Sequence, residues 1–508
     1  MDTIIVLDFG SQYCHLISRR LRDLGVYSEV LPAATPVDTL QAIPELKGVI
    51  LSGGAASVYD SDAPAADPEL LLIGVPILGI CYGHQLIAHL DEGKVTAGTA
   101  GEYGLTSLTV QRPGKLLEGV GPTINVWMNH GDIVESLPSD YTVTATTADA
   151  PVAAFENTKR GLYGTQFHPE VAHTEKGAEM LANFVFDICQ ARAEWSPDSA
   201  MAAITAEIEQ AIGGKKAIIG LSGGIDSSVA ALLVNRVLGK KLVAVYVDTG
   251  LMRYRETELL KETFAPYHLN LRVIDASARF FAGLKGVTDP EEKRKIIGRL
   301  FIEVFDEVAA IEKADVLIQG TIYSDRIESG ATKHSSTIKS HHNVGGLPKD
   351  MKLTVYEPLR ELYKDEVRRV AAELGMPKSI TGRQVFPGPG NAIRIIGEVT
   401  PEKAEIVRQA THIIEETLKE HNLYDRVWMS FAVLLSIKSV GIQGDARSYK
   451  YPIVVRIVES QDAMTANFAD IPHAVLEQIS TRITNQIKAV NRVVYDISNK
   501  PPATMEWE

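Results

Sequence analysis

The sequence predicts an α/β protein made of several domains. Short apolar runs alternate with segments whose apolar residues recur at helical spacing, which is typical of sheets covered by helices. The chain has 508 residues, too many for one hydrophobic core, so we expect about two to four domains. Apolar residues make up 45% and charged residues 23% of the chain, an ordinary composition for a globular protein in water.

A first domain is predicted over residues 1–190. Its expected elements, in chain order, are strand Thr3–Leu7, a helix near Ser11–Leu24, strands Tyr27–Leu31, Gly48–Leu51 and Val75–Ile80, and a helix near Gly83–Leu90. Strands that alternate with helices favour a parallel sheet with helices on its faces. Because ligands collect at the carboxyl ends of such strands, residues that follow a strand are candidates for a functional site.

Cys81 stands at such an end, between a predicted strand and a predicted helix. We expect this tight turn to hold the thiol exposed and the helix N-terminus to favour the nucleophilic thiolate. A thiolate needs a base and an orienting group, and His168 and Glu170 follow the apolar stretch 161–167. The alternatives are a buried structural thiol, a hydrogen-bonded core histidine and a surface glutamate.

The patterns G-x-C-x-G-H-Q at residues 79–85 and F-H-P-E at residues 167–170 resemble those of the triad-type (class I) glutamine amidotransferases. The resemblance implies the fold of that family and the release of ammonia from glutamine. It assigns these roles: Cys81 as the nucleophile, His168 as the proton carrier, Glu170 as its orienting group, and the N–H groups of Gly54 and Tyr82 as the oxyanion hole.

A linker is predicted over residues 191–205 and a second domain over residues 206–392, with a helix near Met201–Ile212. Ala217–Leu221 has the pattern of a buried strand, and helical spacing begins near Ser227. The turn between them consists of Ser222, Gly223, Gly224, Ile225, Asp226, Ser227 and Ser228. Glycines allow a ligand to approach the backbone, and the helix N-terminus favours an anion there. An ordinary Gly-Gly turn is the alternative.

Asp226 is a negative charge inside this predicted anion site, as expected where a divalent cation bridges it to phosphate. A Walker-type loop is excluded because no lysine lies between Ser222 and Gly239. The loop resembles the pyrophosphate loop of the ATP pyrophosphatases, which cleave ATP between the α and β phosphates. The resemblance implies an adenine-nucleotide α-hydrolase-like domain with a parallel sheet, ATP bound at residues 222–228, Mg²⁺ as cofactor and no prosthetic group.

Two further segments of the second domain bear polar residues after a strand. Strand Leu242–Val247 is followed by Asp248, and the run Val316–Ser329 leads from a strand into a polar loop. Residues 328–350 show no apolar period, and a loop of that length predicts a lid. The groups with which this lid would bind phosphate are Lys333, Lys339, His341 and His342. A solvated surface loop is the alternative.

A third domain is predicted over residues 393–508 as a small α+β domain with no chemistry of its own. Strands are expected at Phe431–Gly441 and Tyr451–Glu459, and a helix near Ala474–Val490. For the charged end of the chain, the alternative to a binding role is a frayed terminus.

Further segments resemble the glutamine-hydrolysing GMP synthetase family: residues 247–253, 291–298, 337–348, 386–390 and the final stretch NRVVYDISNKPPATMEWE. The resemblance implies amination of xanthosine monophosphate (XMP) with glutamine and ATP, through an adenylated intermediate, in a homodimer formed by the third domain. It places Asp248 and Asp325 near the nucleotide and its magnesium, with Asp226 and Asp325 as metal ligands. The residues implied to contact XMP are Arg294, Lys339, Gln443, Lys500 and Glu506.

The chain departs from the family pattern without losing a proposed catalytic group. The departures are Ala55 and Ala56 in the first Gly-rich turn, Gly101 before Glu-Tyr-Gly, Asn129 before His-Gly-Asp, Ser324, Arg326, Gln384, Val385 and Asn391. Those in the second domain concern the shape of the substrate pocket.

Composition excludes several other classes of protein. Three cysteines, Cys14, Cys81 and Cys189, are odd in number and widely spaced, which argues against a disulfide framework or a structural zinc site. No secretory signal is recognised, and the longest apolar run, Leu70–Ile80, is too short to span a bilayer. We therefore expect a cytoplasmic protein without a membrane partner. A net charge of −13 argues against broad nucleic-acid binding.

Two other functions use the same features. One is another enzyme with this loop, a transfer-RNA thiolase or an NAD synthetase. The absence of a second cysteine near the loop weighs against the thiolase, and the amidotransferase ahead of the loop favours amination. The other is a regulatory glutamine sensor that binds without turnover, against which the complete set Cys81, His168 and Glu170 argues.

Overall fold

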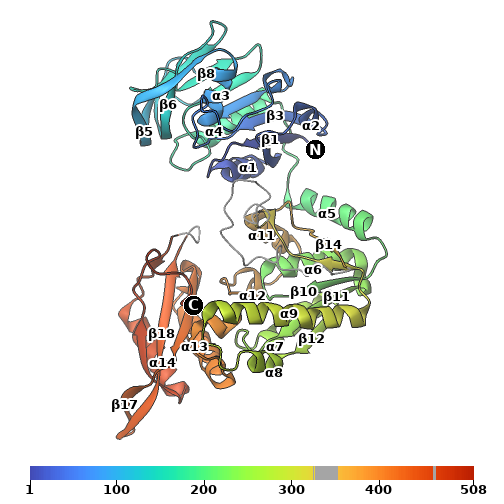
Figure 1. The fold of residues 1–508 in the computed structure, drawn as a ribbon, viewed down its shortest axis with the longest axis vertical. Helices are drawn as coiled ribbons and strands as arrows, with labels where there is room; N and C mark the ends of the chain where they lie inside the picture. The colour runs from blue at the N-terminus through green and yellow to red at the C-terminus, as the bar shows by residue number, and fades with distance from the viewer. Residues whose placement is uncertain (324, 326–352, 461–464) are drawn as a thin grey trace. The chain divides into compact units, whose positions relative to one another are not determined.

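The computed structural model describes residues 1–323, 325, 353–460 and 465–508. These residues form two compact units, residues 1–200 and the described residues from 201 onward (Figure 1). Helix α5 (Pro197–Ile212) runs across the boundary and begins inside the predicted linker. The domain boundaries given above stay predictions.

The first unit contains one mixed sheet in the order β2-β1-β3-β4-β9-β8-β7-β5-β6. Its strands are β1 (Thr3–Asp8), β2 (Tyr27–Pro32), β3 (Leu46–Leu51), β4 (Ile77–Ile80), β5 (Lys94–Val110), β6 (Thr123–Ser136), β7 (Thr142–Thr146), β8 (Ala154–Asn157) and β9 (Leu162–Thr165). Its helices are α1 (Cys14–Asp23), α2 (Val37–Gln41), α3 (Tyr82–Leu90) and α4 (Gly177–Ala182), with short helices at Leu70–Leu72 and Asn183–Ile188.

The apolar run of β1 explains why this strand lies inside the sheet. Ile4 and Val6 belong to the core on one face, whereas Ile5 and Leu7 belong to the core on the other. Side chains alternate along a strand, so a continuous apolar run requires cover on both faces. The neighbouring strands β2, β3 and β4 are parallel, as predicted, β9 continues the parallel part of the sheet, and helices pack on these strands.

The expectation of a purely parallel sheet was incomplete, because β5 to β8 add an antiparallel extension. Strands β5 and β6 form a long hairpin in which exposed and buried residues alternate. Such alternation suits a sheet that faces solvent on one side. This hairpin brings Asn129 beside Cys81.

The second unit contains a fully parallel sheet in the order β12-β11-β10-β13-β14. Its strands are β10 (Ala217–Gly220), β11 (Leu242–Asp248), β12 (Leu271–Asp275), β13 (Val316–Ile318) and β14 (Thr354–Tyr356). The helices around it are α6 (Ile225–Leu238), α7 (Glu256–Phe264), α8 (Ser277–Gly283), α9 (Pro290–Glu312), α11 (Lys364–Glu373) and α12 (Lys378–Thr381). Figure 1 shows α9 along one side of this sheet.

The same unit carries a second sheet formed by the C-terminal residues, in the order β15-β16-β18-β17, with β19 and β20 also on β18. Its strands are β15 (Ile395–Ile396), β16 (Met429–Leu435), β17 (Ser439–Gln443), β18 (Ala446–Glu459), β19 (Asn467–Phe468) and β20 (Val490–Tyr495), and its helices are α13 (Pro401–Glu420) and α14 (His473–Gln486). Short helices lie at Gly239–Lys241, Ala265–Tyr267, Gly390–Arg394 and Tyr424–Arg426.

The single strand predicted at Phe431–Gly441 is wrong, since β16 ends at Leu435 and β17 begins at Ser439. Residues of β16 up to Leu434 are buried, whereas Ile437 and Val440 are 64% and 58% exposed. The apolar residues after Leu435 therefore belong to the exposed hairpin of β17 and β18 rather than to the core. No helix in the described ranges is both long and apolar enough to cross a membrane.

Candidate active sites

The turn between β4 and α3 holds Cys81 in a strained backbone conformation, with φ 53° and ψ −104°. The turn is tight because two glycines flank it. A Cβ on Gly79 would lie 2.3 Å from the Gly83 carbonyl oxygen, and one on Gly83 would lie 2.4 Å from the Leu51 carbonyl oxygen. A non-glycine residue in such a conformation is uncommon and typical of catalytic turns.

The prediction that Cys81 is exposed is wrong, because the residue is 4% exposed. Asn129 of the antiparallel hairpin and Gln166, the residue after β9, lie against it. Its Sγ lies 3.6 Å from the carbonyl oxygen of Asn129 on β6, and Nε2 of Gln166 lies 3.8 Å from Sγ. Contacts made by distant segments of the chain bury the thiol, and the local turn gives no sign of them.

His168 and Glu170 form a buried pair beside this turn. Nδ1 of His168 lies 2.7 Å from Oε1 of Glu170, and the backbone N–H of His168 donates to Trp127 of β6. Gly53 lies against both His168 and Cys81, since a Cβ there would be 3.2 Å from Cε1 of His168 and 3.6 Å from Cβ of Cys81. The structure therefore brings the predicted nucleophile and base together.

Burial lowers the pKa of His168, but the charge of Glu170 and the contact with Cys81 outweigh it, so the pKa lies well above its usual value. Within the described residues, Nε2 of His168 is buried and makes no hydrogen bond with standard geometry. That nitrogen is the one left to exchange a proton with the thiol, while Glu170 fixes the ring through the other.

The variant Glu170→Gln is expected to lower the free energy of unfolding by about 3 kcal/mol at low pH, since it breaks a buried ion pair. A histidine whose pKa is raised on folding stabilises the protein fully below its unfolded pKa, and this stabilisation is lost as pH rises through the folded pKa. The difference between variant and wild type should therefore shrink with increasing pH in urea unfolding curves. The exposed pair Glu179 and Lys176 supplies a control, Glu179→Gln, for which little change is expected.

The predicted oxyanion hole lies in the same turn region. A Cβ on Gly54 would lie 2.7 Å from the Phe9 carbonyl oxygen and 3.2 Å from the Tyr82 ring, so Gly54 and Tyr82 are neighbours. Tyr82 is the first residue of α3, where backbone N–H groups lack partners within the helix. The roles of both N–H groups stay a prediction.

The predicted pyrophosphate loop joins β10 to α6, as the sequence indicates, although the helix begins at Ile225 rather than near Ser227. Its hydroxyls are folded onto the loop: Oγ of Ser222 lies 3.1 Å from Oγ of Ser227, and Ser228 donates to the Gly224 carbonyl oxygen at 2.8 Å. Gly223 has φ 77°, a left-handed conformation that favours glycine. The loop thus presents hydroxyls and a helix N-terminus at one edge of the sheet.

Asp226 of this loop contacts a lysine that sequence reasoning missed. Nζ of Lys364, the first residue of α11, lies 2.5 Å from Oδ2 of Asp226. The fold supplies here the cation that the loop itself lacks. Lys364 follows β14, and the carboxyl ends of parallel strands meet at one edge of the sheet. That topological rule was the available signal, since 138 residues separate the two side chains.

The other Asp226 oxygen, Oδ1, is buried and has no hydrogen-bond partner among the described residues. A buried, unpaired carboxylate oxygen beside a phosphate loop suits Mg²⁺, which prefers oxygen ligands and retains several waters. The Asp248 carboxylate is less available to a metal ion, since it accepts from Gly250 N–H at 2.9 Å and from the Thr257 hydroxyl at 2.7 Å. Asp325 accepts from the N–H of Ile322 at 3.1 Å. The described residues contain no cluster of three or more metal-ligating side chains.

The residues predicted to contact XMP are dispersed over several elements. Arg294 on α9 lies 3.4 Å from Glu291, and Gln443 at the end of β17 donates to the Val490 carbonyl oxygen at 3.4 Å. The backbone of Lys500 pairs with Ala466, and Lys339 lies outside the described residues. No hydrogen bond joins Arg294, Gln443 and Glu506 to one another in the described part of the chain. The lid predicted at residues 328–350 also lies outside it.

The C-terminal residues are held by ion pairs rather than frayed. Glu506 accepts two hydrogen bonds from Arg394, at 3.0 and 2.8 Å, and Arg394 stacks on Phe431. Lys293, the neighbour of the predicted Arg294, is fully buried, and its Nζ contacts Glu508 and donates to the Ile395 carbonyl oxygen at 2.8 Å. A lysine in a helix pattern gives no sign of burial, so sequence reasoning missed this anchor.

A cavity of about 480 Å³ lies in the second unit and was also not predicted. Arg253, Arg383 and Arg408 are among its lining residues. Arg383 is paired with Glu256 and donates to the carbonyl oxygen of Gly223 at 3.2 Å. Arg383, paired with Glu256, thus connects the lining of the cavity to the backbone of the loop.

Three family models match this chain. "Glutamine amidotransferase class-I" matches residues 5–188, "NAD synthase" matches residues 198–278, and "GMP synthase C terminal domain" matches residues 416–507. The first two cover the Cys81 turn and the pyrophosphate loop. The third covers strands β16 to β20 and Glu506.

Relatives match over the full length. A glutamine-hydrolysing GMP synthase of Caldanaerobacter subterraneus is 50% identical over 100% of this chain and 99% of its own. One of Geobacillus kaustophilus has the same identity and coverage. The crystal structure of a putative GMP synthase subunit from Thermoplasma acidophilum is 36% identical over 37% of this chain and 94% of its own, with a TM-score of 0.33. On the full-length likeness to the two GMP synthases of Caldanaerobacter subterraneus and Geobacillus kaustophilus, the chain belongs to the glutamine-hydrolysing GMP synthase family.

Proposed function

We propose that this chain converts XMP, ATP, glutamine and water into GMP, AMP, pyrophosphate and glutamate. The observation that carries the proposal is the geometry around Cys81 in a chain that matches its family from end to end. The pyrophosphate loop on a second parallel sheet supports the use of ATP.

In the glutaminase step, the Cys81 sulfur attacks the side-chain amide carbon of glutamine while His168 accepts the thiol proton. The N–H groups of Gly54 and Tyr82 stabilise the oxyanion, and His168 returns the proton to the departing nitrogen, which leaves as ammonia. Water then attacks the thioester, with His168 as base, and releases glutamate. Glu170 keeps the imidazole oriented and stabilises its charged form through Nδ1.

In the synthetase step, ATP binds at residues 222–228, and the C2 oxygen of XMP attacks the α-phosphate to release pyrophosphate. Ammonia then displaces AMP from C2 and yields GMP. The loop hydroxyls and helix N-terminus hold the phosphates, and Lys364 is placed to neutralise charge beside Asp226. Mg²⁺, held through Asp226 with Asp325 as a further proposed ligand, would supply charge neutralisation on the phosphates.

For the substrate contacts, we propose the set implied by the family likeness: Asp248 near ATP, and Arg294, Lys339, Gln443, Lys500 and Glu506 for XMP. The ion pair with Arg394 supports this for Glu506, because it fixes the carboxylate in one orientation. A cytoplasmic location and the absence of a nucleic-acid partner stay predictions from composition.

We also propose a homodimer formed through the C-terminal sheet. The hairpin of β17 and β18 exposes Val440 opposite Tyr449, 58% and 66% exposed, with Ile442 at 78% beside them. Apolar side chains grouped on one hairpin are typical of a surface that a second subunit covers. Sedimentation equilibrium of the purified chain tests this, and a monomer at micromolar concentration would contradict it.

The proposed reaction is tested by product stoichiometry. The purified chain is incubated with ATP, Mg²⁺, glutamine and XMP, and we expect AMP, pyrophosphate, GMP and glutamate in equal amounts. Because the "NAD synthase" model matches residues 198–278, a parallel reaction with deamido-NAD as acceptor should give no AMP above background. Release of AMP with deamido-NAD but not with XMP would overturn the proposal.

A further inference from the structure

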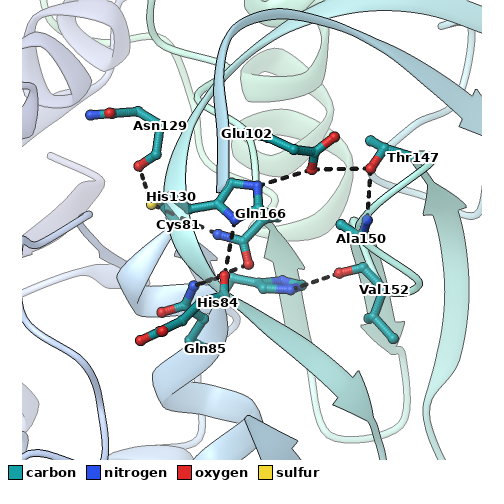
Figure 2. A network of polar contacts seen from close by, with 11 residues as sticks. Cys81, His84, Gln85, Glu102, Asn129, His130, Thr147, Ala150, Val152 and Gln166 are labelled. Carbon is teal, nitrogen blue, oxygen red and sulfur yellow. Dashed lines mark hydrogen bonds and ion pairs between the residues drawn. The ribbon is translucent and has the colours of Figure 1, made fainter. Parts of the chain in front are cut away.

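A second buried polar pair stands on the β5–β6 hairpin, outside the Cys81 triad. Glu102 of β5 and His130 of β6 lie directly opposite in antiparallel register and are 6% and 5% exposed. Figure 2 shows Nε2 of His130 facing Oε2 of Glu102, 3.1 Å away, and the Thr147 hydroxyl donating to the same oxygen at 3.0 Å. A buried pair of this kind is a weak source of stability, because desolvation offsets the attraction.

Both nitrogens of His130 have partners, which fixes the ring. Nδ1 lies 2.9 Å from the carbonyl oxygen of Asp132, which only accepts, so Nδ1 carries a proton. Nε2 faces a carboxylate, so one further proton lies between His130 and Glu102. The imidazole therefore ties the backbone of Asp132 to strand β5 through two hydrogen bonds.

The Asp132 carbonyl oxygen also belongs to a chain of contacts that leads to the nucleophile (Figure 2). The chain runs from Asp132 O to Gln85 Nε2 (2.8 Å), from Gln85 Nε2 to Gln166 Oε1 (3.2 Å), from Gln166 Nε2 to Cys81 Sγ (3.8 Å), and from Cys81 Sγ to Asn129 O (3.6 Å). Since Asn129 and Asp132 lie on either side of His130 on β6, these contacts close into a ring that includes the thiol. The orientation of Gln85 on α3 depends on where His130 holds the Asp132 carbonyl.

We propose that His130 and Glu102 are positioning residues for the glutaminase step. They fix the backbone from Asn129 to Asp132, and that backbone holds Cys81 and Gln85 in place. The inference rests on the proposed function, because it assigns the pair to glutamine hydrolysis and not to the synthetase step. Neither side chain takes part in the proton transfers at the thiol.

The test compares Glu102→Ala, His130→Ala, the double variant and Glu102→Gln in the full chain. Each alanine variant should lower kcat/KM for glutamine by about 10- to 100-fold, mostly through kcat, as found when a supporting partner of a reactive group is removed. The kcat/KM of the double variant should be no lower than that of the less active single variant, because the two residues act as a unit. Glu102→Gln should recover most of the activity, since an amide nitrogen in place of Oε2 can donate one hydrogen to Nε2 of neutral His130 and the other to the Thr147 hydroxyl oxygen.

Two further measurements separate positioning from general loss of structure. Ammonia-dependent GMP formation should stay at the wild-type rate in every variant, whereas alkylation of Cys81 by iodoacetamide, followed by mass spectrometry, should change rate in the alanine variants. The control is Thr109→Ala with Thr123→Ala, an exposed pair directly opposite on the same two strands. These control variants should match the wild type.

Unchanged kcat/KM for glutamine in both alanine variants would overturn the inference. So would an equal fall in ammonia-dependent activity, or a Glu102→Gln variant as impaired as Glu102→Ala. A wild-type chain with no glutaminase activity would instead contradict the proposed function, so the two failures are distinguishable.

Discussion

Replacing Cys81 with alanine is expected to lower the rate of glutamine-dependent GMP formation by on the order of 10⁴-fold or more. Ammonia-dependent GMP formation should stay intact. The thiol is the nucleophile that attacks glutamine in the proposed glutaminase step, and its removal leaves His168 without a thiol proton to accept. The pyrophosphate loop belongs to the other compact unit, so the synthetase step retains its residues. Initial rates of GMP formation with glutamine and with ammonium chloride provide the measurement.

Cys189→Ala is the matched control, since Cys189 is also a buried cysteine of the first unit, 6% exposed. It should retain both activities. Loss of both activities in a folded Cys81→Ala protein would argue that the two reactions do not use separable sites.

Replacing Asp226 with alanine is expected to remove GMP formation with either nitrogen source, by about 10³-fold or more. The change deletes the carboxylate whose Oδ1 lacks a partner among the described residues, and it leaves Lys364 without its ion pair beside the loop. Loss of the proposed Mg²⁺ ligand removes charge neutralisation on the ATP phosphates, and this effect outweighs the release of Lys364. Glutamine hydrolysis should persist, because Cys81, His168 and Glu170 are unchanged.

Pyrophosphate release and glutamate release, measured in the same Asp226→Ala sample, separate the two steps. Asp275→Asn is the control. Asp275 also ends a strand of this parallel sheet, but its carboxylate caps Ser277 at the start of α8. Pyrophosphate release at the wild-type rate in Asp226→Ala would contradict the assignment of Asp226 to the ATP site.

The sequence predicted what depends on neighbours in the chain. Continuous apolar runs gave β1, β4 and β11 within a residue or two, and the Gly-Gly turn between strand and helix gave the loop at Ser222. The pairing of His168 with Glu170 was also accessible, because the two residues are only two positions apart.

The main failures concern contacts between distant segments. Burial of Cys81 comes from β6 and β9, the ion pair of Asp226 comes from α11, and the burial of Lys293 comes from Glu508. None of these contacts leaves a periodic pattern in the sequence, because each partner, taken alone, is of a residue type that is common on protein surfaces. The split of the strand predicted at residues 431–441 has the same origin, since apolar letters do not tell a core strand from an exposed hairpin.

The steric limits at Gly79 and Gly83 bear on how this motif persists during evolution. Both glycines are required by the approach of α3 to the sheet, because any added carbon would meet a main-chain oxygen or its neighbours. Selection for the architecture alone would therefore preserve them after the sulfur had been lost. A descendant that had become catalytically silent would still carry both glycines of the pattern. The thiol and the distant His168, rather than the glycines, therefore distinguish an active enzyme from an inactive descendant.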